Sequence, residues 1–286
     1  MGLLRVGTYN LSGAVGRARR FYGRLLASTA KLERARAGAL AAGRLLAGHD
    51  LDVVALQEVD VARAGTRCTD QPALIADALD HEVAFVPLTE LDLGGWVSAR
   101  SGLSMSTRTP PLRSFAFELP RRRRLRLFSR RAQVVDLPVA GRVLRIINVH
   151  LCHDDAELRA RQLRVVLDHA RQHGPAVIVG DLNTSPPATR CVGMLEAELY
   201  QHDRCMEALL SCPGLVADPR AMSCLEGGPL AGLATYPSDH PVLKLDYLLL
   251  VDPSGRFRLG AERVLAVGPE LSDHRPVIAT LEWSES

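Results

Sequence analysis

The sequence predicts a single α/β domain, in which helices pack on the outside of β-sheets. Strand-like apolar runs and amphipathic helical segments are interspersed along the whole chain. The chain shows no internal repeat, no low-complexity segment and no long linker. Its 286 residues, 47% of them apolar, suffice for one substantial core. We therefore expect one domain that spans residues 1–286.

The first third of the chain is expected to hold two strands and two helices. Residues 3–10 predict a buried strand that begins almost at the first residue. Residues 29–47 space leucines among alanine and arginine at helical intervals, and Gly48 suits the end of such a helix. A second buried strand is expected over residues 52–59, followed by a short helix over 72–79.

The remainder of the chain alternates short strands with further helices. The clearest helix covers residues 156–173, with Asp154 or Asp155 as its N-cap and an apolar face of leucine and valine. A second helix-like segment covers residues 188–210. Apolar runs bounded by glycine and proline predict strands over residues 83–88, 102–107, 115–119, 132–139, 143–151, 176–180, 243–251, 262–267 and 276–281.

The bulk properties favour a reduced, cytoplasmic protein. The net charge of +3 is small, so it permits an anionic substrate without requiring a polyanion. None of the six cysteines forms a CxxC pair, which argues against a zinc site. The early strand leaves no room for a signal peptide, and no apolar run reaches the ~18 residues of a transmembrane segment. We expect a monomer.

Polar side chains stand beside the ends of five predicted strands. They are Asn10, Glu58, His150, Asp181 with Asn183, and Asp273 with His274. Rigid strands commonly aim such groups at one edge of a sheet to build a site. The carboxylates and amides among them offer only oxygen ligands, which suit Mg²⁺ or Mn²⁺. The histidines are then free to contact phosphate oxygens.

These residues lie in stretches that resemble the endonuclease/exonuclease/phosphatase superfamily. The stretches are GTYNL (7–11), VVALQEV (53–59), SGLSMSTRTP (101–110), INVHL (147–151), VIVGDLN (177–183), TYPSDHPVLKLDYLLL (235–250) and SDHRPVIATL (272–281). They follow the order of the family and span nearly the whole chain. The resemblance implies a four-layer αββα sandwich, two mixed β-sheets face to face with helices outside, and Mg²⁺-dependent hydrolysis of phosphate esters.

The resemblance also implies which residues surround a metal ion and activate water. Glu58 matches the main metal-binding glutamate of the family, and Asn10 and Asp273 match other residues around the metal. Asp181 matches the aspartate that orients or deprotonates the attacking water. Asn183 matches the asparagine that holds this water and a phosphoryl oxygen.

Three further residues match groups that act on the phosphate. His274 matches the histidine that contacts the scissile phosphate, and Asp246 matches the carboxylate paired with that histidine. His150 matches a second phosphate-contacting histidine of the nuclease and sphingomyelinase branches, which disfavours the abasic-site endonucleases. Leu103 stands where many relatives have asparagine in the third motif, and Ser-Gly-Leu at this place is similar to the sphingomyelinases.

The substrate remains open at this level. One basic run is either a solvated hairpin tip or a binding surface for nucleic acid or an anionic membrane; it consists of Arg121, Arg122, Arg123 and Arg124. A nuclease acting on DNA or RNA, a sphingomyelinase-like lipid phosphodiesterase and a small-molecule phosphatase are all compatible with the motifs. A non-catalytic binding protein on the same fold is disfavoured, because the full set of catalytic residues is intact.

Overall fold

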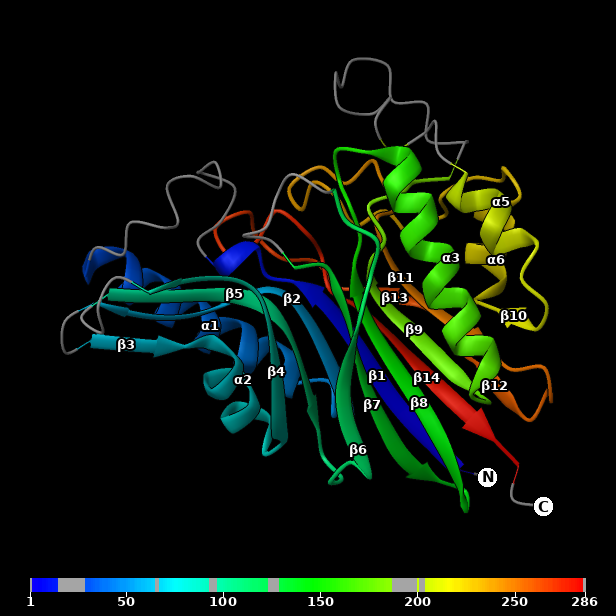
Figure 1. The fold of residues 1–286 in the computed structure, drawn as a ribbon, viewed down its shortest axis with the longest axis horizontal. Helices are drawn as coiled ribbons and strands as arrows, with labels where there is room; N and C mark the ends of the chain where they lie inside the picture. Colours follow the sequence, from blue (N-terminus) through cyan, green and yellow to red (C-terminus); the bar gives the residue numbers. More distant parts are fainter. Residues whose placement is uncertain are drawn as a thin grey trace.

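The fold is a four-layer sandwich of two mixed β-sheets packed face to face, with helices on the outside (Figure 1). It is seen in a computed structural model that describes residues 2–14, 29–64, 67–92, 97–122, 129–186, 200 and 204–284. The α/β class and the αββα arrangement predicted above are therefore confirmed.

The first sheet brings together the two ends of the chain. Its strand order is β12-β14-β1-β2-β5-β4, with β13 beside β14 and β3 beside β2. The central strand β1 runs parallel to β2 and antiparallel to β14. The strands are β1 (Gly2–Asn10), β2 (Val53–Ala64), β3 (Arg67–Asp70), β4 (Glu82–Asp92), β5 (Val97–Thr107), β12 (Phe257–Leu259), β13 (Arg263–Val264) and β14 (Val277–Trp283).

The second sheet has the order β10-β11-β9-β8-β7-β6. Its central strands β8 and β9 are parallel, and β11 pairs with β9 in the antiparallel sense. The strands are β6 (Arg113–Glu118), β7 (Arg131–Val139), β8 (Arg142–His150), β9 (Ala176–Asp181), β10 (Leu215–Val216) and β11 (Asp246–Val251).

Helices form the two outer layers. The first sheet carries α1 (Thr29–Ala47) and α2 (Gln71–Leu79), and the short 3-10 helix η1 (Ser12–Ala14) follows β1. The second sheet carries α3 (Ala156–Gln172), α5 (Cys205–Leu210) and α6 (Pro219–Leu225). Asp155 caps α3, because its Oδ1 accepts a hydrogen bond of 2.9 Å from the Leu158 amide, as the sequence predicted.

Alternation along each strand sends its side chains into different hydrophobic cores. On β2, Val53 and Ala55 face the space between the sheets, whereas Val54 and Leu56 face α1 and α2. On β9, Val177 faces the space between the sheets and Ile178 faces α3. Successive side chains of a strand point to opposite faces, so a strand buried on both sides reads as one continuous apolar run.

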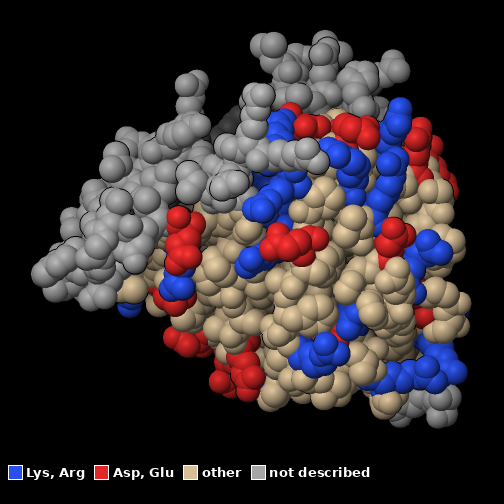
Figure 2. Space-filling model, in the orientation of Figure 1, with Lys and Arg blue, Asp and Glu red and all other residues tan. Residues whose placement is uncertain are grey.

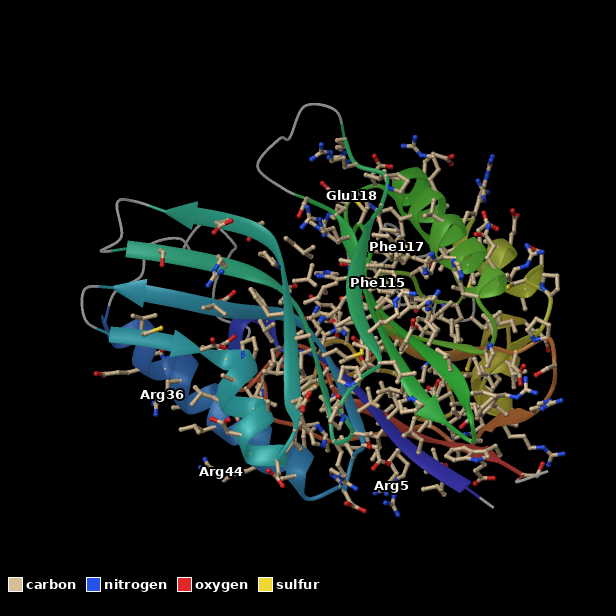
Figure 3. The ribbon with its side chains drawn as sticks, turned by 60° about the horizontal axis from the view of Figure 1, so that its bottom comes forward. Arg5, Arg36, Arg44, Phe115, Phe117 and Glu118 are labelled. Atoms are coloured by element: carbon tan, nitrogen blue, oxygen red, sulfur yellow. The ribbon has the colours of Figure 1, made fainter. Side chains whose placement is uncertain are left out.

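The edge strand β6 packs against α3 through aromatic side chains (Figure 3). The ring of Phe117 stacks on His169 with centroids 4.2 Å apart, and Phe115 meets the same histidine edge-on. Arg145 beneath them forms a buried, two-pronged ion pair with Asp136 at 2.7 and 2.8 Å. The aromatic contacts with His169 hold β6 against α3, away from the polar strand ends.

Several strands are longer than the apolar pattern predicted. β4 and β5 each run for 11 residues, and β2 for 12 residues, because all three continue as a paired arm past the two-sheet core. Polar residues such as Thr89 and Glu90 occupy this arm, so hydrophobicity does not mark it. The helix α6 and the short strands β3, β10 and β12 were not predicted.

Parts of the sequence predictions fall on residues outside the described ranges. The predicted helix over 188–210 is one, and within it the structure describes Tyr200, Arg204 and α5. Arg123 and Arg124 are others. The described cysteines are free thiols. None of the helices within the described ranges is long and apolar enough to span a membrane.

Candidate active site

The polar residues converge because three neighbouring strands of the second sheet present them side by side. Asp181 ends β9, and the strand register places His150 of β8 beside it on one flank. On the other flank, Asp246 at the start of β11 lies opposite Asp181. The facing sheet contributes Asn10 from the end of β1. Parallel and antiparallel neighbours thus bring residues far apart in sequence to one sheet edge.

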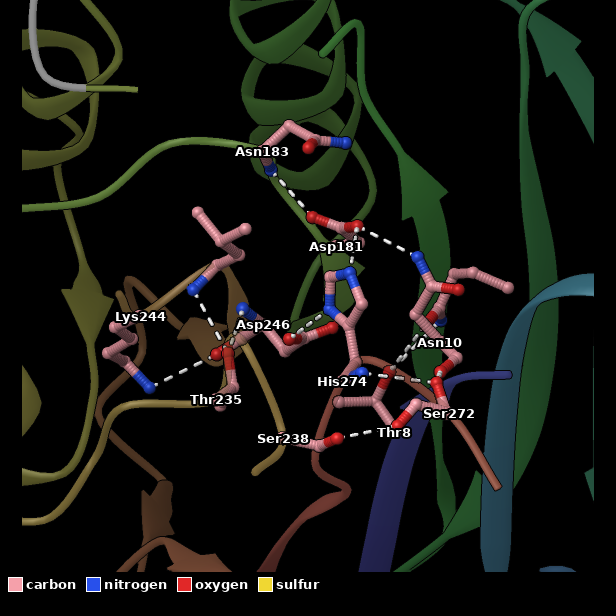
Figure 4. A network of polar contacts seen from close by, with 12 residues as sticks. Thr8, Asn10, Asp181, Asn183, Thr235, Ser238, Lys244, Asp246, Ser272 and His274 are labelled. Atoms are coloured by element: carbon pink, nitrogen blue, oxygen red, sulfur yellow. Dashed lines mark hydrogen bonds and ion pairs between the residues drawn. The ribbon is translucent and has the colours of Figure 1, made fainter. Parts of the chain in front are cut away.

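Asp181 is the centre of this arrangement (Figure 4). Its Oδ2 accepts a hydrogen bond of 2.9 Å from the Asn10 amide nitrogen. The Nε2 atoms of His150 and His274 lie 3.7 and 3.8 Å from the same oxygen. Its Oδ1 accepts a hydrogen bond of 2.8 Å from the Asn183 amide. One buried carboxylate is therefore oriented from both oxygens and faced by two imidazoles.

His274 and Asp246 form the predicted contact. His274 Nδ1 donates to Asp246 Oδ2 at 2.9 Å, which leaves Nε2 directed toward Asp181. Backbone contacts hold both partners, because Thr235 Oγ1 accepts from the Asp246 amide and Ser272 Oγ accepts from the His274 amide. The hydrogen bond to a carboxylate fixes the ring orientation of His274 and favours its charged form.

The electrostatics assign opposite charge states to the two histidines. Burial alone lowers the pKa of His274, but the carboxylates of Asp246 and Asp181 outweigh it and raise this pKa to about 10. Burial lowers the pKa of His150 to about 4, with Glu58 opposing and Arg130 adding to the effect. His274 is thus a cationic donor at neutral pH, whereas His150 is neutral.

Asp181 combines burial with a raised pKa. Burial raises the pKa of this carboxyl to about 7, even though His274 and the Asn10 hydrogen bond favour its charged form. A group that titrates near neutral pH can take up a proton from water and release it again. The arrangement therefore offers a base in Asp181 beside a proton donor in His274.

Glu58 lies at an irregularity in β2. The register between β2 and β5 shifts between Leu56 and Val59, and Glu58 has a φ of 51°, in the left-handed region. Such a bulge re-aims a side chain and costs of order 1–3 kcal/mol of backbone strain. Here it directs the carboxylate into the site, where Glu58 Oε1 lies 3.4 Å from Asn10 Nδ2 and 4.0 Å from His150 Nε2.

A buried polar network supports this bulge and was not singled out from the sequence. Asn148 Nδ2 donates to the backbone carbonyls of Leu56 and Ser104, on either side of the β2–β5 pairing. Its Oδ1 accepts a hydrogen bond of 2.7 Å from Gln57 Nε2. Isolated polar residues inside apolar strands are the only sequence signal, because Asn148 lies in the second sheet and these partners lie in the first.

The donor set fits a hard divalent cation. Glu58 and Asp273 offer carboxylates to the same pocket, and the buried Asp273 Oδ1 has no hydrogen-bond partner among the described residues. A buried carboxylate oxygen without a donor is costly unless a cation compensates it. Asn10 is engaged differently, since its oxygen accepts from the Ser12 amide and its nitrogen donates to Asp181.

A second grouping could also hold a metal ion. Asp181, Asp246 and His274 each offer one ligand atom, and these atoms lie within 4.8 Å of one another. The hydrogen bond between His274 and Asp246 already occupies Nδ1 of the histidine and Oδ2 of the aspartate. A metal ion bound to those two atoms would have to replace this contact, so the grouping is better suited to holding protons.

Of the site residues predicted from the sequence, all except Asn10 and Asp246 line one pocket of about 410 Å³. The pocket also contains Tyr200, Tyr236 and three arginines that the sequence had not placed there. The ring of Tyr236 lies 5.0 Å from that of His274. Ser101 and Gly102 of the third motif line the pocket, whereas Leu103 is fully buried in the sheet. Asn183 lines it too, although its amide nitrogen donates to the Leu151 carbonyl.

Comparison with solved structures shows the same fold in several proteins. An endonuclease/exonuclease/phosphatase from Beutenbergia cavernae is 23% identical, with a TM-score of 0.68 over 99% of this chain and 72% of that one. A humanized D. rerio TDP2 is 17% identical, with a TM-score of 0.62 over 98% and 99%. A mannosyl-6-phosphatase from Bacteroides thetaiotaomicron is 16% identical, with a TM-score of 0.60 over 98% and 100%.

No curated protein matches the chain. The sequence model of one family does, and the match covers residues 7–274, which includes all the polar strand ends described above. Because that match spans most of the chain, it identifies the family, as the motifs had indicated. The chain belongs to the endonuclease/exonuclease/phosphatase family.

Proposed function

We propose that this protein is a Mg²⁺-dependent phosphoesterase that hydrolyses a P–O bond by direct attack of water. The observation that carries the proposal is the environment of Asp181, a buried carboxylate faced by two imidazoles and oriented by two amide donors. Phosphate-ester hydrolysis requires an activated water and donors for the phosphoryl oxygens. One pocket contains both a carboxylate that can activate water, Asp181, and imidazoles that can donate to the phosphoryl oxygens, His150 and His274.

Glu58 and Asp273 are the proposed metal-binding carboxylates, and Asn10, whose amide nitrogen lies 3.4 Å from Glu58 Oε1, is the third residue proposed near the metal. Mg²⁺ typically takes one or two carboxylates and keeps several waters, which matches this small donor set. When bound, the cation supplies neutralisation of the charge on the phosphoryl oxygens. Mn²⁺ has similar ligand preferences and should substitute.

Asp181 acts in the proposal as the base that orients and deprotonates water. His274, held charged by Asp246, donates from Nε2 to an oxygen of the phosphate. His150 is neutral and so donates one hydrogen bond to the phosphate without adding charge. Asn183 lies beside Asp181 in the pocket and assists in holding the water. Each contact that strengthens as charge develops lowers the barrier to reaction.

The ester that is hydrolysed is a separate question. One solved relative is described as a mannosyl-6-phosphatase, and D. rerio TDP2 was solved with a single-strand DNA product. The fold therefore accommodates more than one substrate type. At sequence identities of 16–17%, neither relative's substrate can be assigned to this chain. A nuclease or a sphingomyelinase-like activity remains an alternative to a phosphatase.

A substrate panel tests the proposal. Purified protein is assayed with Mg²⁺ against plasmid DNA, RNA, sphingomyelin vesicles, sugar and inositol phosphates, and a chromogenic phosphodiester. We expect hydrolysis of at least one class, lost when a chelator is added and lost in Asp181→Asn. Hydrolysis that persists in excess chelator would refute the metal dependence, and equal activity of Asp181→Asn would refute the role of Asp181 as the base.

A further inference from the structure

Three arginines occupy one side of the active-site pocket. Arg121, Arg122 and Arg130 line it together with His150 and His153. They lie at the two ends of a segment that we call the arginine loop, residues 120–130, of which 123–128 fall outside the described ranges. Part of the basic run noted in the sequence therefore belongs to the walls of the site.

Hydrogen bonds tie both ends of the arginine loop to the core. Gln162 of α3, fully buried, donates to the Pro120 carbonyl at 2.7 Å and accepts from the Cys152 amide at 2.8 Å. At the other end, the Ser129 amide donates to the Leu88 carbonyl at 2.9 Å. The two ends are also joined, since the Leu119 amide donates to the Arg130 carbonyl. The pocket arginines are thus mounted on a fixed frame.

The three arginines are not equivalent. Arg122 contacts Asp154 at 3.1 Å and Asp155 at 3.2 Å, so its charge is compensated at the start of α3. Within the described part of the chain, neither Arg121 nor Arg130 forms an ion pair. Two cations that face a pocket without a carboxylate partner favour an anion there.

The position of Arg130 relates this wall to the reacting groups. Arg130 lines the same pocket as His150 and Cys152. Burial lowers the pKa of His150 and raises that of the Cys152 thiol, and the charge of Arg130 adds to the first effect and opposes the second. His150 in turn lies 3.7 Å from Asp181. An anion beside Arg121 and Arg130 and a phosphate at Asp181, His150 and His274 would share one pocket, so a single molecule can carry both.

The rest of the pocket suits a compact organic molecule. Tyr200, Tyr236, Leu88, Leu158 and Leu245 contribute apolar surface, and the volume of about 410 Å³ falls in the range of small-molecule sites. Where Figure 2 shows the surface in colour, Lys and Arg are intermixed with Asp and Glu.

We propose that Arg121 and Arg130 form a second anion subsite, so that the substrate is a small organic phosphate ester with a second phosphate group. The inference rests on the proposed function and adds the substrate class. The scissile phosphate lies at Asp181, the second phosphate lies at Arg121 and Arg130, and the organic part contacts the tyrosines. A molecule with two phosphates should bind more tightly than one with a single phosphate, because once the first phosphate is bound the second binds intramolecularly.

Binding measured by calorimetry tests the subsite without depending on turnover. The probes are fructose 1,6-bisphosphate and fructose 6-phosphate, which differ by one phosphate group. Asp181→Asn serves as the background, so that a hydrolysable probe survives the titration. We expect the bisphosphate to bind at least about tenfold more tightly, and this preference to vanish in Arg121→Gln/Arg130→Gln.

Arg131→Gln is the matched control. Arg131 neighbours Arg130 in sequence but pairs with the exposed Glu118 at 2.7 Å, outside the pocket, so the preference should persist.

Equal binding of the two sugars, no binding of the bisphosphate, or a preference that survives the double replacement overturns the subsite. Tighter binding of hexathymidylate than of the bisphosphate through the same arginines overturns the small-molecule class. Metal-dependent hydrolysis of a monophosphate alone would sustain the proposed function while the subsite fails.

Discussion

Asp246 and His274 are joined by a hydrogen bond of 2.9 Å although 28 positions separate them in the sequence. The contact exists because β11 begins at Asp246 while His274 precedes β14 of the opposite sheet. The pair therefore spans the two sheets of the sandwich. Its second imidazole nitrogen is left to face Asp181, 3.8 Å away.

The first prediction is that this pair acts as a unit. Asp246→Asn should reduce kcat by about 10²–10³-fold, because His274 loses the carboxylate that keeps it charged and oriented. His274→Ala should reduce kcat at least as much, and the double variant should be little worse than His274→Ala alone. Steady-state kinetics of the three variants supply the comparison. Strictly multiplicative losses would show that the two residues act independently.

The second prediction concerns the metal. Glu58→Gln should weaken Mg²⁺ binding markedly, because a neutral amide replaces a carboxylate in a site with few charged ligands. Glu118→Gln, which removes an exposed carboxylate paired with Arg131, should bind Mg²⁺ as the wild type does. Isothermal titration with MgCl₂ measures both. Equal affinity in wild type and Glu58→Gln would exclude Glu58 as a ligand.

The third prediction concerns the network beneath the bulge. Asn148→Ala should lower the free energy of unfolding by roughly 1–3 kcal/mol, because the buried carbonyls of Leu56 and Ser104 lose their donor. It should also weaken Mg²⁺ binding, since Glu58 follows the Leu56–Gln57 segment that Asn148 holds. Urea denaturation and titration calorimetry give the two quantities. A fully stable variant, or one with unchanged metal affinity, would contradict this role.

The fourth prediction is an acid-labile contact between β6 and α3. Burial, His173 and Arg145 lower the pKa of His169 from 6.5 to about 4, so the unfolded chain binds this proton more readily than the folded one. Its contribution to stability is therefore complete above pH 6.5 and is lost as the pH falls toward 4. His169→Gln should flatten the decline of the melting temperature in this window. The same replacement at the exposed His240 should leave the decline as in the wild type.

Sequence patterns predicted the layers of the fold because burial imposes a period on each element. β9 reads as an unbroken apolar run since Val177 and Ile178 enter two different cores. The helix over residues 29–47 has the same bounds in the structure. The polar residues at strand ends could be predicted as one site, because adjacent strands end at the same edge.

Other features depend on contacts that no local pattern encodes. The bulge at Glu58 is stabilised by Asn148 from the other sheet, so β2 alone gives no sign of it. Arg122 differs from the other pocket arginines because it pairs with Asp154 and Asp155, which lie more than 30 positions away in the sequence. Side-chain partners of this kind are fixed by tertiary packing, which local periodicity does not report.

The central claim, direct attack of water on phosphorus assisted by Asp181, is tested by following the oxygen. A substrate identified in the panel is hydrolysed with Mg²⁺ in water enriched in the heavy oxygen isotope, and both products are analysed by mass spectrometry. We predict one labelled oxygen in the phosphoryl product, none in the alcohol, and no labelled product from Asp181→Asn. Label in the alcohol, or equal labelling by Asp181→Asn, would contradict the account.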